Sequence, residues 1–165
     1  MLVPFLLLLA LSSGASDLLA GDAFFKGGVV VEPRDVGFEG RWRVSFGSDY
    51  AVNFHETVFV GFELLGSVYR QDVVGGGTAT VIPGNGFVNV KYKSSSLGAR
   101  PFGGGGLGLV GDLRFVSSET QWNKNFGFHL MGGVELGRLV LEFQLTGSPD
   151  EEIATEYSFW AGFVW

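Results

Sequence analysis

Apolar residues recur at every second position through much of the chain, and a period of two is typical of β-strands. The last segment, from residue 152 to residue 165, shows the pattern most plainly. One of its faces carries Tyr157, Phe159, Ala161, Phe163 and Trp165. The interleaved positions are mostly small or polar. Because successive side chains of a strand point to opposite faces, this segment predicts a strand with one apolar face and one mixed face.

The same alternation predicts eight strands. They cover about residues 24–32, 38–46, 53–70, 87–93, 107–116, 126–136, 139–146 and 152–165. Turn-forming residues separate them, and the stretches 75–77 and 83–86, rich in Gly, Pro and Asn, predict one long loop. Short strands that follow one another closely along the chain are expected to pair antiparallel with their neighbours.

Charged residues occupy many of the positions opposite the apolar ones. The candidates for a shared polar network are Glu39, Arg41, Arg43, Glu63, Lys91, Asp112, Arg114, His129, Glu135, Glu142 and Glu156. Such groups would satisfy one another inside a narrow lumen. They would also serve as the exterior of a soluble sandwich, so periodicity by itself leaves both architectures open.

The N-terminus and the aromatic last strand favour a membrane. Residues 2–11 form an apolar core, and small residues follow at 13–15, as in a secretory signal peptide over residues 1–15 with cleavage as late as residue 20. The absence of Lys or Arg before the apolar core leaves an uncleaved anchor as the alternative. That core is too short to span a bilayer as a helix.

Together these features predict an all-β fold, an eight-stranded antiparallel up-and-down transmembrane β-barrel over residues 21–165. A closed barrel is required because a free sheet edge would leave backbone groups unpaired in hydrocarbon. With both termini periplasmic, the connections at 71–86, 117–125 and 147–153 lie outside, and those at 47–52 and 137–138 lie inside. The link at 94–106 is long for an inside turn, and the link at 33–37 is short for an outside loop.

Composition narrows the function further. The chain has 165 residues, enough for one domain, with 27 glycines, 16 phenylalanines and a net charge of −6. The acidic balance argues against nucleic acid as a partner. There are no cysteines, which excludes a disulfide framework and a thiolate metal site.

Three stretches in the second half of the chain resemble a known protein family. They are RPFGGGGLGLVGDLRF, NFGFHLMGGVELGRLVLEFQLTG and YSFWAGFVW, within residues 99–165, and they resemble the small OmpA-like and OmpX-like outer-membrane β-barrels. The resemblance implies a barrel in the outer membrane of a Gram-negative-type cell, exported through the general secretory route. It implies no catalytic residues. We also expect no appended peptidoglycan-binding domain after the barrel.

Motifs that could carry chemistry have simpler explanations. Gly106, Gly108 and Gly111 match the spacing of a dinucleotide-binding loop, but they lie within an alternating strand, so a bend or a close backbone approach is favoured. His129 could take part in proton or acyl transfer with Glu135 and Glu142, although the His-x-Ser signature of the lipid A deacylases is missing. We expect solvated side chains at 55–56 and 150–152. No catalytic, cofactor-binding or metal-binding residue is assigned, and no cofactor is expected.

The sequence therefore predicts a non-enzymatic outer-membrane barrel for surface interaction or envelope structure. A narrow conduit or carrier for small solutes is the alternative, and a lipid A-modifying enzyme is a third. An eight-stranded interior is filled by side chains, so no open porin-like channel is expected. Expected partners are outer-membrane lipids, lipopolysaccharide and the barrel-assembly machinery, with the chain a monomer. The candidate assembly signal is Tyr157, Phe159, Phe163 and Trp165.

Overall fold

The computed structural model describes residues 21–33, 38–52, 57–72, 77–94, 98–116, 119–149 and 155–165. The described residues form nine strands. These are β1 Gly21–Pro33, β2 Phe38–Ala51, β3 Val58–Gly66, β4 Tyr69–Asp72, β5 Thr78–Lys93, β6 Ala99–Val116, β7 Glu119–Leu136, β8 Leu139–Gly147 and β9 Glu156–Val164. Within these ranges no helix is long and apolar enough to cross a membrane.

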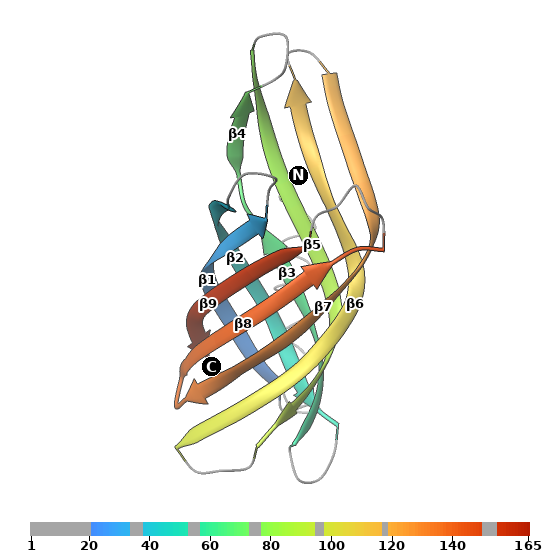
Figure 1. The fold of residues 1–165 in the computed structure, drawn as a ribbon. Coiled ribbons are helices and arrows are strands. Elements are labelled where there is room, and N and C mark those ends of the chain that lie inside the picture. The colour runs from blue at the N-terminus through green and yellow to red at the C-terminus, as the bar shows by residue number, and fades with distance from the viewer. Residues whose placement is uncertain are drawn as a thin grey trace.

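The strands close into one antiparallel barrel. Adjacent strands in the order β3-β2-β1-β9-β8-β7-β6-β5-β4 are hydrogen-bonded, and β3 also pairs with β5. β3 and β4 both pair with β5 and are two parts of one strand interrupted at residues 67–68. The barrel is therefore eight-stranded, as the sequence predicts, and Figure 1 shows its strongly tilted strands.

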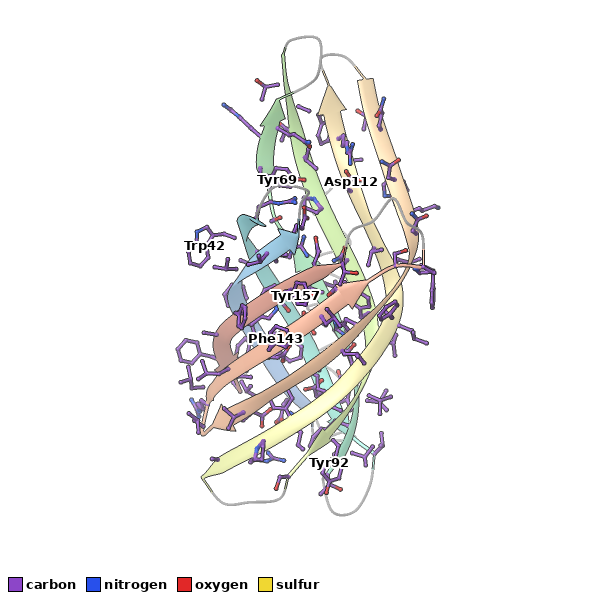
Figure 2. The ribbon with its side chains drawn as sticks, viewed as in Figure 1. Trp42, Tyr69, Tyr92, Asp112, Phe143 and Tyr157 are labelled. Carbon is purple, nitrogen blue, oxygen red and sulfur yellow. The ribbon has the colours of Figure 1, made fainter. Side chains whose placement is uncertain are left out.

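Side chains alternate across the wall as the period of two requires. We define the apolar belt as the exposed outward residues Phe25, Trp42, Val44, Val60, Leu64, Val88, Val90, Leu107, Leu109, Phe126, Phe128, Leu130, Leu141, Phe143, Phe159 and Phe163. Figure 2 shows the Trp42 ring projecting away from the wall. Charged inward residues such as Lys26 and Glu63 are buried. An apolar exterior around a charged interior is the arrangement of a barrel embedded in hydrocarbon.

The predicted break at 83–86 is wrong, because these residues lie inside β5. The predicted continuous strand 53–70 is also wrong, because it is interrupted opposite Pro83. The Ser67 N–H donates to the Pro83 carbonyl oxygen at 3.2 Å. In a regular antiparallel pair Pro83 would return an N–H to Ser67, but proline has none. Pro83 therefore accounts for both errors. Proline is common in turns, and its missing N–H interrupts the hydrogen-bond ladder with the facing strand.

The connections predicted at 94–106 and 117–125 are also wrong, because β6 starts at Ala99 and β7 at Glu119. Glycines of β6 pack directly on β5. A Cβ added at Gly106 would lie 2.1 Å from Asn89 Oδ1, and one at Gly108 would lie 1.9 Å from the Gly86 carbonyl oxygen. This close approach is the predicted role of these glycines, and they continue the strand instead of ending it.

Strands β5, β6 and β7 reach well beyond the ends of β1, β2, β8 and β9, and β4 lies beside them (Figure 1). We call this extension the protruding sheet and the adjoining end of the barrel the mouth. The opposite end, the base, holds the start of β1 and the tight turn at Gly137–Arg138, where Gly137 has φ 61°. That two-residue turn agrees with the sequence prediction.

Candidate functional site: a filled lumen below a charged mouth pocket

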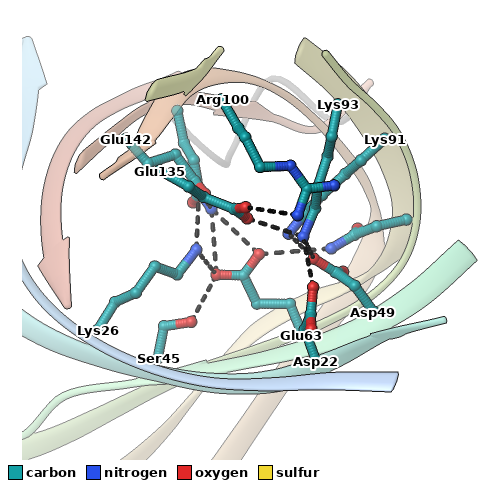
Figure 3. Close-up of polar contacts among 12 residues, drawn as sticks. Asp22, Lys26, Ser45, Asp49, Glu63, Lys91, Lys93, Arg100, Glu135 and Glu142 are labelled. Carbon is teal, nitrogen blue, oxygen red and sulfur yellow. Dashed lines mark hydrogen bonds and ion pairs between the residues drawn. The ribbon is translucent and has the colours of Figure 1, made fainter. Parts of the chain in front are cut away.

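A central cluster crosses the middle of the lumen. Lys26 Nζ from β1 lies 2.7 Å from Glu63 Oε1 of β3 and 2.8 Å from Glu142 Oε1 of β8. Ser45 Oγ donates to Glu63 at 2.5 Å, and Gln144 Nε2 donates to both carboxylates at 2.5–3.1 Å. Figure 3 shows Lys26, Ser45, Glu63 and Glu142 meeting across the barrel. One ammonium group thus bridges two buried carboxylates, and Gln144 donates hydrogen bonds to both of them.

A second cluster, the base cluster, fills the lumen near the start of β1 and the end of β9. Lys93 Nζ lies 2.7 Å from Glu135 Oε1 and 3.3 Å from oxygens of both Asp49 and Asp22. Lys91 Nζ lies 3.1 Å from Asp49 Oδ2, and Arg100 lies 3.8 Å from Glu135 (Figure 3). Three cations therefore face three carboxylates in this cluster.

His129 connects to the central cluster through an amide. Its Nε2 lies 2.7 Å from Asn89 Oδ1, and Asn89 Nδ2 donates to Glu63 Oε2 at 3.4 Å. The imidazole also stacks on the Phe87 ring, with a centroid separation of 4.1 Å. His129 is 1% exposed and lies in the lumen. The sequence suggested His129, Glu135 and Glu142 as a possible proton-transfer or acyl-transfer group. In the structure the three side chains have different partners, because Glu135 pairs with Lys93 and Glu142 pairs with Lys26.

The two clusters leave little space between them. A cavity of about 10 Å³ lies among Phe24, Lys26, Lys91, Phe102 and Glu142. This is about the smallest volume that holds a single water molecule. At the level of these residues the described side chains fill the barrel, as expected for eight strands.

A larger space, the mouth pocket, lies at the opposite end of the lumen. Its volume is about 200 Å³, and residues of β1, β2, β4, β5, β6, β8 and β9 line it. Arg43 Nη1 and Nη2 donate to the two Glu156 carboxylate oxygens at 2.5 and 2.9 Å. Arg41 pairs with Glu32 and lies 4.2 Å from the Tyr69 ring centroid.

The third ion pair of the mouth pocket, Arg114 with Asp112, lies on the protruding sheet. The described lining therefore carries three guanidinium groups and three carboxylates. Such a pocket presents hydrogen-bonding groups to charged ligands of either sign.

The single polar network that the sequence predicts divides between these levels. Glu63, Glu142 and His129 lie at the centre, Lys91 and Glu135 at the base, and Arg41, Arg43, Asp112, Arg114 and Glu156 at the mouth. The side chain of Glu39 is outside the described part of the chain, as are the predicted signal peptide and residues 55–56 and 150–152. Among the described residues, no group of three or more His, Asp or Glu is placed to hold a metal ion.

The sequence reasoning missed the two lysines that organise the lumen, Lys26 and Lys93. It also missed Asp22 and Asp49, which pair with Lys93, and Glu32, which pairs with Arg41. The sequence around Lys26 does indicate that this side chain faces the lumen. Lys26 is the only charge between Phe24 and Val31, and a lone charge in a membrane-spanning strand has to face the lumen.

The candidate assembly residues lie on the outer surface. Tyr157, Phe159, Phe163 and Trp165 are 39–64% exposed. β9 closes the barrel against β1, and Trp165 exchanges two backbone hydrogen bonds with Ala23, at 2.9 and 3.0 Å. The predicted pairing of the last strand with the first is confirmed, while recognition by the assembly machinery stays a prediction.

No family model and no curated protein matches the chain. Among solved structures, Neisserial surface protein A is similar with a TM-score of 0.72 and 9% identity, covering 87% of this chain and 95% of that one. The attachment invasion locus protein Ail of Yersinia pestis, solved with the heparin analogue sucrose octasulfate, gives 0.60 at 8% identity, covering 88% and 97%. OprG of Pseudomonas aeruginosa gives 0.52 at 14% identity, covering 88% and 94%. At these identities the similarity establishes the fold, which is that of the small eight-stranded outer-membrane barrels.

Proposed function

We propose that this protein is a non-enzymatic, non-conducting integral protein of the outer membrane whose protruding sheet binds an extended segment of an extracellular partner protein. The observation that carries the proposal is the free edge of β7. The ladder between β7 and β8 starts only at Phe128–Gly147, whereas the ladder between β6 and β7 continues to Val116–Glu119. Residues 119–124 therefore pair on one side only among the described strands.

A one-sided strand is a template for another strand, because its backbone donors and acceptors can continue the ladder. The composition of this edge suits an aqueous surface. Gln121 and Asn123 are exposed, and Trp122 is 69% exposed with Lys124 Nζ 4.9 Å from its ring centroid. An exposed aromatic ring beside free backbone groups is typical of residues that anchor partners.

The filled lumen argues against the conduit alternative. A solute would have to displace the central cluster, where Lys26 and Glu63 are 1% and 0% exposed. Breaking such a buried pair costs several kcal/mol. We therefore expect no steady current when the purified barrel is reconstituted in planar bilayers. A stable conductance step would contradict the proposed function.

The extracellular role can be tested by shortening the protruding sheet in register. Leu113 faces Trp122, so replacing residues 113–122 by an Asn-Gly turn joins the facing residues Asp112 and Asn123. Cells that display the full-length or the shortened barrel would be tested for adhesion to immobilised extracellular matrix proteins. Full-length protein with Trp122→Ala serves as the matched control for loss of the ring alone.

We expect the shortened protein to lose adhesion and to keep the gel mobility shift of a folded barrel upon heating. Trp122→Ala should retain part of the adhesion, because the backbone edge remains. Unchanged adhesion by the shortened protein, at equal surface amounts, would exclude the protruding sheet as the binding surface.

A further inference from the structure

The backbone groups along the free edge of β7 follow a regular alternation. Leu136 and Leu139 flank the two-residue turn at 137–138, and such a pair exchanges two hydrogen bonds. Hydrogen-bonded pairs alternate with non-hydrogen-bonded ones, so the even-numbered residues of β7 direct their N–H and carbonyl groups toward β8. Ser148 Oγ donates to the Phe126 carbonyl oxygen at 2.8 Å, in agreement with this alternation. Where β8 has ended, the even-numbered residues therefore present their backbone groups outward.

Three residues form this outward row, namely Thr120, Trp122 and Lys124. They lie beyond the last pair of the β7–β8 ladder, and the side chains of all three are exposed. Their outward N–H and carbonyl groups have no strand partner among the described strands. The row is evenly spaced about Trp122. A second copy turned end for end therefore presents the same row in the antiparallel sense.

One register between two copies uses the whole row. It sets Trp122 opposite Trp122 of the second copy and Thr120 opposite Lys124. All three residues of each copy then belong to hydrogen-bonded pairs, each of which exchanges two N–H···O bonds. If Trp122 faced Lys124 instead, Thr120 would lie opposite Phe126, whose carbonyl oxygen already accepts from Ser148. The edge is thus complementary to itself in one arrangement.

The side chains also match in that register. Directly opposite residues share a face, so the two Trp122 rings lie side by side and each Lys124 lies beside a Thr120 hydroxyl. The ammonium group of Lys124, already 4.9 Å from the Trp122 ring centroid of its own chain, is diagonal to the second Trp122. On the other face Gln121 lies opposite Asn123, and the two amides can hydrogen-bond. Among residues 120–124 no charge faces a like charge.

We propose that the partner bound at this edge is a second copy of the same chain, displayed on a facing membrane. β7 runs from the mouth to the base (Figure 1), so two copies in one membrane carry it in the same sense along the membrane normal. An antiparallel pair therefore joins copies whose mouths point toward each other, as on two apposed cells. This inference rests on the proposed function, because it assigns a partner to the same edge.

The register can be tested with single cysteines, because the chain has none of its own. Barrels with Thr120→Cys or Lys124→Cys would be reconstituted separately, one per nanodisc, and oxidised either alone or mixed. In the proposed register the Cα atoms of positions 120 and 124 are about 5.5 Å apart, within the range of a disulfide. Identical positions are displaced by four residues along the ladder, about 13 Å, which is too far.

Disulfide-linked dimers should therefore form in the mixture and not in either variant alone. Non-reducing gels measure both. Absence of dimers from the mixture, or equal amounts of dimer in the single-variant samples, would overturn the proposal.

The backbone contribution can be tested with Trp122→Pro. The N–H of residue 122 points away from β6, so its loss leaves the β6–β7 ladder intact and removes the central donor of the row. Trp122→Ala is the matched control, since it loses the same ring and keeps the N–H. Cells that display the unmodified barrel should clump, Trp122→Ala should retain part of the clumping, and Trp122→Pro should lose it. The gel mobility shift upon heating verifies that each variant is folded. Equal clumping by Trp122→Pro and the unmodified barrel, at equal surface amounts, would contradict pairing through this edge.

Failure of this inference is distinguishable from failure of the proposed function. Adhesion to matrix proteins that requires the protruding sheet, together with no mixed disulfide, would leave the proposed function in place and exclude a second copy as the partner. Mixed disulfides without adhesion to matrix proteins would support self-pairing and restrict the partner to the same chain.

Discussion

Lys26 is the residue that balances the charge at the centre of the lumen. It is fully buried, and it neutralises two carboxylates that would otherwise repel each other across the lumen. Its Nζ also lies over the Phe24 and Trp160 rings, 4.8 and 5.6 Å from their centroids. Replacing the ammonium group therefore affects charge balance more than packing.

Lys26→Met should destabilise the folded barrel by about 3–5 kcal/mol, because Glu63 and Glu142 are left buried without their cation. The double variant Lys26→Met/Glu63→Gln should recover part of this loss, since one of the two carboxylates is then neutral. Urea unfolding in lipid vesicles measures both. Additive effects of the two substitutions would show that the residues are not coupled.

Phe143 and Glu142 are neighbours on opposite faces of β8, so a change of charge at each should alter the stability of the barrel by different amounts. Arg at Phe143, which faces lipid, should destabilise by about 2–4 kcal/mol near the bilayer midplane. Glu142→Gln should cost less, because Lys26 keeps Glu63 as a partner. The same unfolding assay compares them, and equal tolerance at the two positions would mean that the assigned faces are wrong.

At the level of elements, the sequence predicts the faces of the strands far better than their ends. Burial depends directly on the period of two, so Leu141 and Glu142 are assigned correctly to the outside and the lumen. A strand ends where its hydrogen-bond ladder ends, and residues 119–125 continue the ladder without any apolar face to reveal it. The partners of Lys26 are equally hidden, because contacts across the lumen depend on the stagger of all the strands.

Pro83→Ala should repair the third strand. The new N–H points toward Ser67, whose own N–H already donates to the carbonyl of residue 83. One added hydrogen bond should stabilise the barrel by about 0.5–1.5 kcal/mol and slow hydrogen exchange at residues 67–68. Gly84→Ala is the control, because its Cβ fits at 4.0 Å from the Leu65 carbonyl oxygen and adds no donor. Unchanged exchange in Pro83→Ala would show that the proline does not cause the interruption.

The whole molecule combines a rigid membrane-spanning half with a sheet that extends past it. The apolar belt surrounds the first, whereas exposed polar residues such as Gln121 and Asn123 occur on the second. The two parts share β5, β6 and β7 without a break (Figure 1). Motion of the sheet relative to the barrel is therefore limited by continuous strands.

The mature chain should fractionate with the outer membrane and require detergent for extraction, because the apolar belt would otherwise be exposed to water. Unheated samples should migrate differently from boiled ones on gels, since a closed barrel resists detergent at low temperature. Membrane fractionation and paired gels check this. A soluble monomer in the periplasmic fraction would contradict it.

The central cluster also has a consequence for how the barrel closes. Along the last seam, β1 and β9 meet through backbone hydrogen bonds that any register could form, yet Lys26 faces Gly162 in only one of them. A slip by one residue would turn the ammonium group into hydrocarbon. A slip by two would keep it inside but shift it one position along β9 on the inner face, away from Glu63 and Glu142. Because Lys26 and Glu142 are 116 residues apart in sequence, their ion pair requires both β1 and β8 to be in place and therefore favours the register that closes the barrel correctly.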